Sequence, residues 1–125
     1  MRALLITSEG VIETAIGEKV ENTYRLMDGL PYSKKVGNLE SMYRLMGCQT
    51  ITSAGYPDRA HACWADDEAL LTMQDGDQAT KVSWHPEPLI GRLLVTGINS
   101  QGGTTSATLS VDELQSMVKH GVLHL

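Results

Sequence analysis

The chain has 125 residues, a formal net charge of −5 and an ordinary globular balance of 42% hydrophobic and 20% charged residues. This composition argues against overall disorder, and the length predicts a single domain over residues 1–125. The excess of acids argues against binding to a nucleic acid polymer, and no stretch approaches the length of a bilayer span. The N-terminus enters a strand-like pattern without the features of a secretory signal, so we expect a cytoplasmic protein.

Four tyrosines, two tryptophans and no phenylalanine leave the core to aliphatic residues and methionine. A domain of this size buries only about two thirds of its unfolded surface, so we expect it to gain stability as a homo-oligomer. Cys48 and Cys63 are expected to be reduced, because the chain lacks a secretory signal.

The N-terminal pattern predicts a hairpin followed by a long loop. Two apolar runs, 3–6 and 11–16, flank a Ser-Glu-Gly turn that is typical of a hairpin. Residues 17–37 mix polar residues with glycine and proline, which predicts a loop. Asn38 is a good N-cap and apolar residues follow at helical spacing, so we expect a helix over 38–47.

The middle of the chain predicts a second hairpin and a short capped segment. Residues 49–54 and 60–65 have strand patterns on either side of a turn with Pro57 and Asp58. The acidic run 66–68 is expected to cap a short segment over 69–73.

The C-terminal part predicts strands and a closing helix. We expect strands over 79–84, over the apolar run 89–98 with a bulge at Gly91, and over 104–109. Ser110 and Glu113 fit a capping box, which predicts a helix over 110–120. The element order predicts an α+β fold, with a mostly antiparallel sheet of short hairpins and two principal helices, at about 38–47 and 110–120.

Several patterns suggest chemistry but favour structural roles. Residues 97–105 have the glycine spacing of a phosphate-binding loop, yet Gly103 stands where the lysine should be. His120 and His124 have the spacing of two zinc ligands on a helix, but Gly121 separates them. The acidic run 66–68 has no second carboxylate motif to complete a Mg²⁺ site. We therefore expect no catalytic site, no metal site and no cofactor.

Aromatic and cationic side chains in the expected loops favour a ligand site instead. An aromatic ring beside Arg or Lys can stack a base and neutralise a phosphate. Arg92 lies inside an apolar run, where it requires either a ligand or an acid on a neighbouring strand. The candidate ligand-binding residues are Trp84, His85, Arg92, Tyr56, Arg59, Asn99, Thr104 and Thr105, with Tyr32, Lys34 and Lys35 as further loop residues of the same kind.

Four segments resemble a family of small bacteriophage and mobile-element proteins that is catalogued as a domain of unknown function. They are MRALLIT, the segment LESMYRLMGC running into QTIT, CWADDEALL, and PEPLIGRLLVTG with the glycine-rich loop after it. Together they cover most of residues 1–109. The chain lacks the asparagine expected near residues 82–85. The resemblance implies a phage origin more directly than an activity.

Small phage proteins without a catalytic signature frequently act against host defence, and this analogy gives two hypotheses. The first is a non-enzymatic protein that sequesters a nucleotide-derived immune signal, either a cyclic oligonucleotide or an ADP-ribose-like compound, between the loops of an oligomer. The alternative is a protein that inhibits a host defence enzyme by covering it. The first predicts a pocket lined by Arg92, Trp84 or Tyr56, and the second predicts a contiguous exposed apolar patch.

Overall fold

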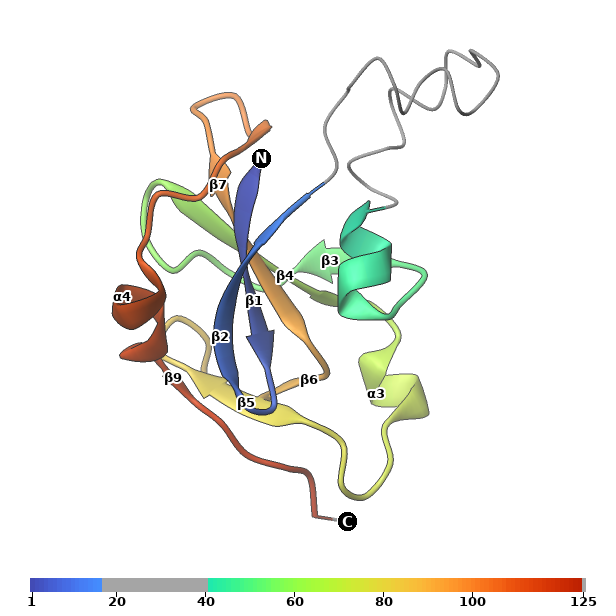
Figure 1. Ribbon diagram of the computed structural model, residues 1–125. Helices are drawn as coiled ribbons and strands as arrows, with labels where there is room; N and C mark the ends of the chain where they lie inside the picture. Colours follow the sequence, from blue (N-terminus) through green and yellow to red (C-terminus); the bar gives the residue numbers. More distant parts are fainter. Residues whose placement is uncertain (17–40, 125) are drawn as a thin grey trace.

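The computed structural model describes residues 1–16 and 41–124 (Figure 1). Residues 41–46 are helical, and the expected loop at 17–37 and the start of the expected helix at 38–40 lie outside the described residues. The labelled elements are β1 Arg2–Thr7, β2 Gly10–Ala15, β3 Ile51–Ser53, β4 His61–Asp66, α3 Ala69–Thr72, β5 Ala79–Val82, β6 Leu89–Ile90, β7 Leu93–Ile98, β8 Thr104–Thr105, α4 Val111–Gln115 and β9 Val118–Lys119.

The main sheet is antiparallel, with the strand order β2-β1-β7-β4-β3 and β8 paired to β7. Both expected hairpins, β1–β2 and β3–β4, are confirmed. Strand β7 lies between them, because Val95 is paired with Leu4 on one side and with Cys63 on the other. The most apolar run of the sequence is therefore the central strand.

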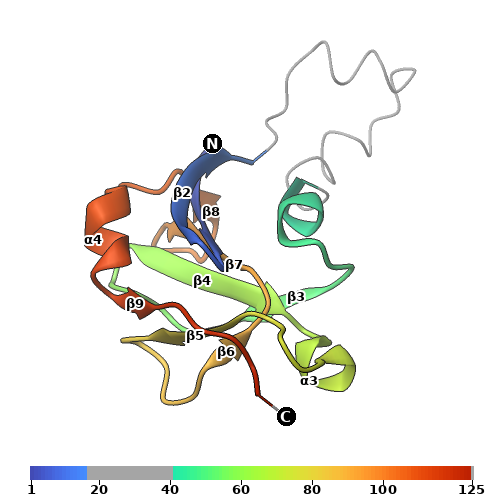
Figure 2. The same ribbon diagram turned by 60° about the horizontal axis from the view of Figure 1, so that its bottom comes forward.

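Alternation along the central strands buries both faces of this sheet. Leu4 and Leu93 belong to one cluster, which α4 covers with Leu114. Leu5 and Leu94 point to the opposite face and pack with Met42 and Met46 of the helical residues 41–46. Figure 2 shows α4 and this helix on opposite sides of the sheet. Strands buried on both faces read as continuous apolar runs, as RALLIT and LLVTGI do.

The single strand expected over 89–98 is wrong at its N-terminal end, because the structure has two separate strands there, β6 and β7. Gly91 has a φ of +83°, a left-handed conformation that ends the strand rather than forming a bulge within it. Residues Leu89–Ile90 then pair with β5 in a second, three-stranded sheet of order β6-β5-β9. The expected strand over 79–84 is shorter in the structure and ends at Val82.

The closing helix is also shorter than expected. The capping box is confirmed, since the Ser110 side chain accepts from the Glu113 N–H and Glu113 accepts from the Ser110 N–H. The helix nevertheless ends at Gln115 instead of residue 120, because Val118 and Lys119 pair with β5 as β9. Likewise only Thr104–Thr105 of the expected strand 104–109 is a strand.

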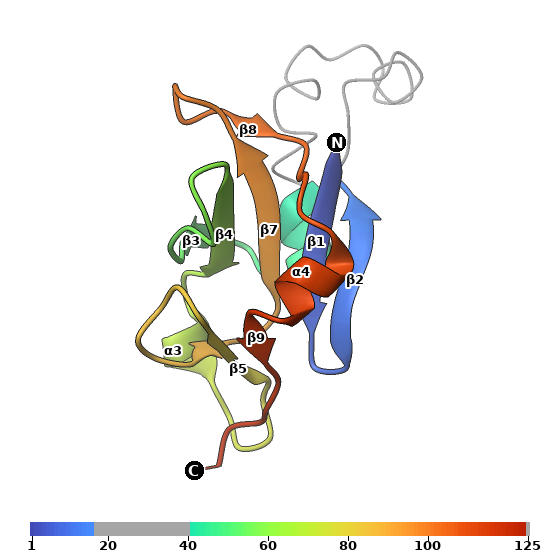
Figure 3. The same cartoon turned by 90° about the vertical axis from the view of Figure 1, so that its left-hand side faces the viewer.

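The fold is thus a mostly antiparallel, sheet-dominated α+β fold with three short helical segments among residues 1–16 and 41–124. The sequence predicted two principal helices, whereas the structure has three helical segments, all of them short, among these residues. Within the same residues, no helix is long and apolar enough to cross a membrane. Figure 3 shows that the β3–β4 turn and the β7–β8 loop lie at one end of the sheet and that α3 lies at the other.

Candidate binding site

The structure places the eight expected ligand-binding residues in three regions rather than one. Tyr56 and Arg59 lie in the turn between β3 and β4, next to the loop that carries Asn99, Thr104 and Thr105. His85 lies near α3 at the other end of the sheet. Arg92 lies beside the β1–β2 turn. Tyr32, Lys34 and Lys35 lie outside the described residues.

Trp84 packs against the core behind the β3–β4 turn. Its indole Nε1 donates to the Ala54 carbonyl at 3.1 Å. A Cβ atom on Gly55, whose φ is +90°, would lie only 2.9 Å from Trp84 Cδ1. The indole therefore supports the backbone of this turn from behind, while Tyr56, the residue after Gly55, has 58% of its surface exposed.

A shallow concavity of about 470 Å³ opens at this end of the sheet, lined by Tyr56, Asp58, Arg59 and Ile98. We call it the tip concavity. The side chain of Arg59 is exposed, and it makes no hydrogen bond or ion pair with any described residue. An exposed aromatic ring beside an unpaired guanidinium is therefore present in the turn, as expected from the sequence.

The neighbouring loop is held by its own polar residues. The Asn99 side-chain oxygen accepts from the backbone N–H groups of Gln101 and Gly103, at 3.0 and 2.8 Å. Thr104 and Thr105 pair with the end of β7. Gly97, directly opposite Thr105, has no room for a Cβ atom, which would lie 2.3 Å from the Ser106 carbonyl oxygen. The loop is a tight β-hairpin, and its Asn99 side chain is used in forming it.

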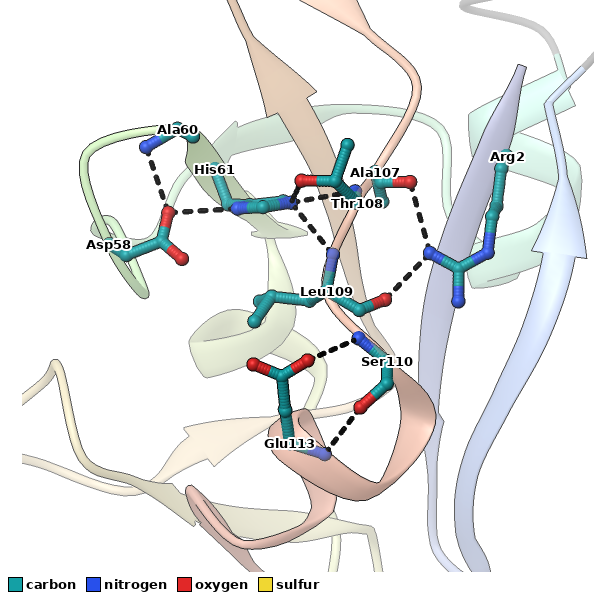
Figure 4. Close-up of polar contacts among 9 residues, drawn as sticks. All are labelled: Arg2, Asp58, Ala60, His61, Ala107, Thr108, Leu109, Ser110 and Glu113. Atoms are coloured by element: carbon teal, nitrogen blue, oxygen red, sulfur yellow. Dashed lines mark hydrogen bonds and ion pairs between the residues drawn. The ribbon is translucent and has the colours of Figure 1, made fainter.

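Asp58, which lines the tip concavity, is hydrogen-bonded to the buried His61, and Figure 4 shows this contact. The Asp58 carboxylate accepts from His61 Nδ1 and from the Ala60 N–H, both at 2.8 Å. Buried His61 Nε2 accepts from the N–H groups of Thr108 and Leu109, at 2.9 and 3.2 Å. Nε2 therefore carries no proton, and Nδ1 carries the proton donated to Asp58.

From the other side, Arg2 holds the same C-terminal segment (Figure 4). Its guanidinium donates to the carbonyls of Ala107 and Leu109, at 3.0 and 2.6 Å, and also pairs with Glu13. Side chains thus satisfy the N–H groups of Thr108 and Leu109 and the carbonyls of Ala107 and Leu109. The Ala107 N–H instead donates to the backbone carbonyl of Arg2. We call Arg2, Asp58 and His61 the clamp.

The clamp leaves Asp58 charged at neutral pH. Burial acts to raise the pKa of Asp58, but the hydrogen bonds from His61 and the Ala60 N–H outweigh it and hold that pKa below the ordinary value. One oxygen makes both of these bonds, and the carboxylate also lines the tip concavity. It therefore keeps an acceptor oxygen for a hydroxyl group, a role that the sequence analysis missed.

In the described part of the chain, Arg92 is not paired with the acid that the sequence offered as one possible partner. Its guanidinium donates to the Leu45 carbonyl at 3.1 Å, and no acid pairs with it among the described residues. It also lines a shallow concavity of about 620 Å³ beside the β1–β2 turn, with Gln115. Gln115 is itself engaged, because its Oε1 accepts from the Val11 N–H and its Nε2 bonds His120.

The remaining side chains with metal-binding or thiol chemistry are the potential metal ligands and the two cysteines. The described residues contain no group of three His, Cys, Asp or Glu side chains that is arranged to hold a metal ion. Burial raises the pKa of Cys63 to about 12, which keeps this thiol protonated. Burial and the charge of Asp66 raise the pKa of Cys48 as well.

These features define a small, sheet-dominated α+β protein with an exposed Tyr56 and an exposed Arg59 in a turn at one end of the sheet. The chain belongs to the family described as Domain of unknown function (DUF3846), whose sequence profile matches residues 1–119. No curated protein and no solved structure matches the chain.

Proposed function

We propose that the protein binds a nucleotide-derived small molecule at the tip concavity and holds it without converting it. The carrying observation is the cluster of Tyr56, Asp58 and Arg59 around one opening. Each residue suits one part of a nucleotide. The exposed Tyr56 ring offers a stacking face for a base, Arg59 offers a cation for a phosphate, and the free oxygen of Asp58 accepts from a ribose hydroxyl.

The electrostatics favour a ligand with few phosphates. The chain carries a net charge of −5, and Arg59 is the one cation that lines the tip concavity among the described residues. A nucleoside triphosphate would place more negative charge there than one guanidinium can neutralise. A cyclic oligonucleotide or an ADP-ribose-like compound has fewer charges per base and suits the site better.

The concavity is shallow, so a single copy leaves much of a ligand exposed. Tight binding sites bury most of the ligand surface. We therefore propose that a second copy of the chain covers the bound ligand in a homo-oligomer. The resemblance of the sequence to small bacteriophage proteins supports a narrower role, the sequestration of a nucleotide immune signal in the cytoplasm of a host cell.

The test is to incubate the purified protein with a panel of cyclic oligonucleotides and cyclic ADP-ribose isomers, remove free compound, denature the protein and analyse what is released by mass spectrometry. We expect one unchanged compound at near-stoichiometric yield, lost in Tyr56→Ala and in Arg59→Ala. Arg92→Ala is the matched control, because Arg92 lies outside the tip concavity. Recovery of a new product, or loss of binding in the control alone, would contradict the proposal.

The alternative function, inhibition of a host defence enzyme by covering it, is favoured by a separate observation. Leu70 and Leu71 are 73% and 84% exposed on α3, at the end of the sheet away from the tip concavity. An inhibitor of this kind requires an exposed apolar surface, and α3 supplies one.

A further inference from the structure

A second concavity, of about 290 Å³, lies beside α3, and it differs in chemistry from the tip concavity. Its floor comes from β3 and β4, its first wall from α3 and its second wall from the segment before and within β6. We call it the α3 groove. Its lining includes Asp66, Asp67, Leu70, Glu87, Leu89 and Ile90.

The walls of the α3 groove are apolar and accessible. Leu70 stands on one wall with 73% of its surface exposed, and Leu89 and Ile90 form part of the other. Leu71, on the same short helix, is 84% exposed. Adjacent leucines with so little burial contribute almost nothing to folding, because the hydrophobic stabilisation depends on the area removed from water. They gain that stabilisation when a further apolar surface covers them.

The rim of the α3 groove is acidic. Asp66, Asp67 and Glu87 line it, and none of them forms an ion pair with a Lys or Arg of the described residues. Glu68 is also exposed between Asp67 and α3. Three carboxylates beside these apolar walls attract a cationic partner and repel an anionic one. A second copy of this acidic chain would bring like charges together there.

We propose that the α3 groove binds a basic peptide segment of a partner protein, which inserts apolar side chains between α3 and β6 and places Lys or Arg side chains beside Asp66, Asp67 and Glu87. Apolar anchors in the groove supply most of the affinity, and the charged rim selects the partner. This binding is independent of any ligand at the tip concavity. It also deepens the alternative function above by giving the chemistry of the partner surface.

The probe for this proposal is a short fluorescein-labelled peptide of leucine and lysine. Its controls are a peptide with glutamate in place of lysine and another with serine in place of leucine. We expect fluorescence anisotropy to detect binding of the Leu/Lys peptide but not of either control peptide. The affinity should fall as the salt concentration rises. Amide chemical shifts should change at residues 69–71 and 85–90 and remain unchanged around Tyr56.

Exposed positions give variants that leave the fold intact. Leu70→Ser combined with Leu71→Ser should weaken binding at least tenfold, and Asp67→Asn combined with Glu87→Gln should weaken it several-fold at low salt and reduce the salt dependence. Ile12→Ser is the matched control, because Ile12 is also half exposed but lies on β2. Binding that survives the double leucine change, or shift changes elsewhere on the surface, would overturn the proposal.

Self-association is the other informative outcome. If sedimentation shows a wild-type dimer that the double leucine variant abolishes, the groove takes a second copy, and the proposed basic partner is wrong. If the peptide fails to bind while a nucleotide is still captured at the tip concavity, the groove proposal fails and the first function stands.

Discussion

The two ends of β4 carry different kinds of surface. At the start of the strand, His61 is hydrogen-bonded to the C-terminal segment and to Asp58, and Tyr56 and Arg59 are left exposed in the turn before it. After the strand, the exposed side chains are Leu70 and Leu71, surrounded by carboxylates. One end thus suits a small polar ligand and the other suits an apolar, basic segment. We associate binding with the side chains that the fold leaves unpaired and, at Asp58, with the carboxylate oxygen outside the clamp.

The largest expected effect comes from removing a side chain that the fold does use. His61→Ala leaves the N–H groups of Thr108 and Leu109 without their acceptor and opens a buried space, so we expect the free energy of unfolding to fall by about 3 kcal/mol. Urea denaturation followed by circular dichroism measures it. Arg59→Ala, from the same turn, is the control and should change stability by less than about 0.5 kcal/mol. Equal losses of stability in the two variants would contradict the distinction between His61, which holds the fold, and Arg59, which does not.

Arg2 should show the next effect. Arg2→Met removes the donors to the Ala107 and Leu109 carbonyls while it keeps an aliphatic chain, so we expect a loss of about 1–2 kcal/mol in the same assay. Arg2→Lys should recover part of that loss, because an ammonium group can donate to one carbonyl but not bridge both as well. A wild-type value in Arg2→Met would show that the clamp acts through His61 alone.

Asp58 gives a smaller effect that depends on pH. Its pKa is lowered in the folded protein, so its contribution to stability is present above the unfolded-state value, near pH 4, and is lost as pH falls through the folded value. The side chain is 42% exposed and water screens the interaction, which limits the contribution to under about 1 kcal/mol. Wild type should therefore be slightly more stable than Asp58→Asn at pH 7, and this difference should shrink steadily as pH falls below about 4. A difference that does not change with pH would assign the effect to the hydrogen bonds rather than the charge.

The two thiols provide the smallest and simplest test. Cys63 is fully buried with a pKa of about 12, whereas Cys48 is partly exposed. Iodoacetamide at pH 8 should label Cys48 slowly and leave Cys63 unmodified until denaturant is added, as intact-mass spectrometry can show. Rapid labelling of Cys63 in the native protein would mean that the sheet opens readily at β4.

Local patterns predicted the two hairpins, the capping box and a strand in the apolar run that contains β7, because turn residues, caps and apolar runs act over short distances. The end of the closing helix was missed, since Val118 and Lys119 pair with β5, a strand far away in the sequence.

For the candidate site, Tyr56 and Arg59 were identified by residue type. Trp84 was assigned to the ligand on the same criterion, and only the packing against Gly55 shows its supporting position. The sequence gives no sign of the Asp58–His61 hydrogen bond beyond the i, i+3 spacing of the two residues. It also does not predict that Leu70 and Leu71 are exposed, because that depends on which distant residues pack around α3.

The central place of β7 has a consequence for how the protein is made. Strands β1 and β4 are both synthesised before β7, yet each pairs with it and not with the other. On the ribosome, the two early hairpins must therefore wait with apolar edges uncovered until residue 98 has emerged, and the clamp can close only after residue 109. A newly made chain is thus most susceptible to aggregation and to proteases in the interval before residues 107–109 have been synthesised.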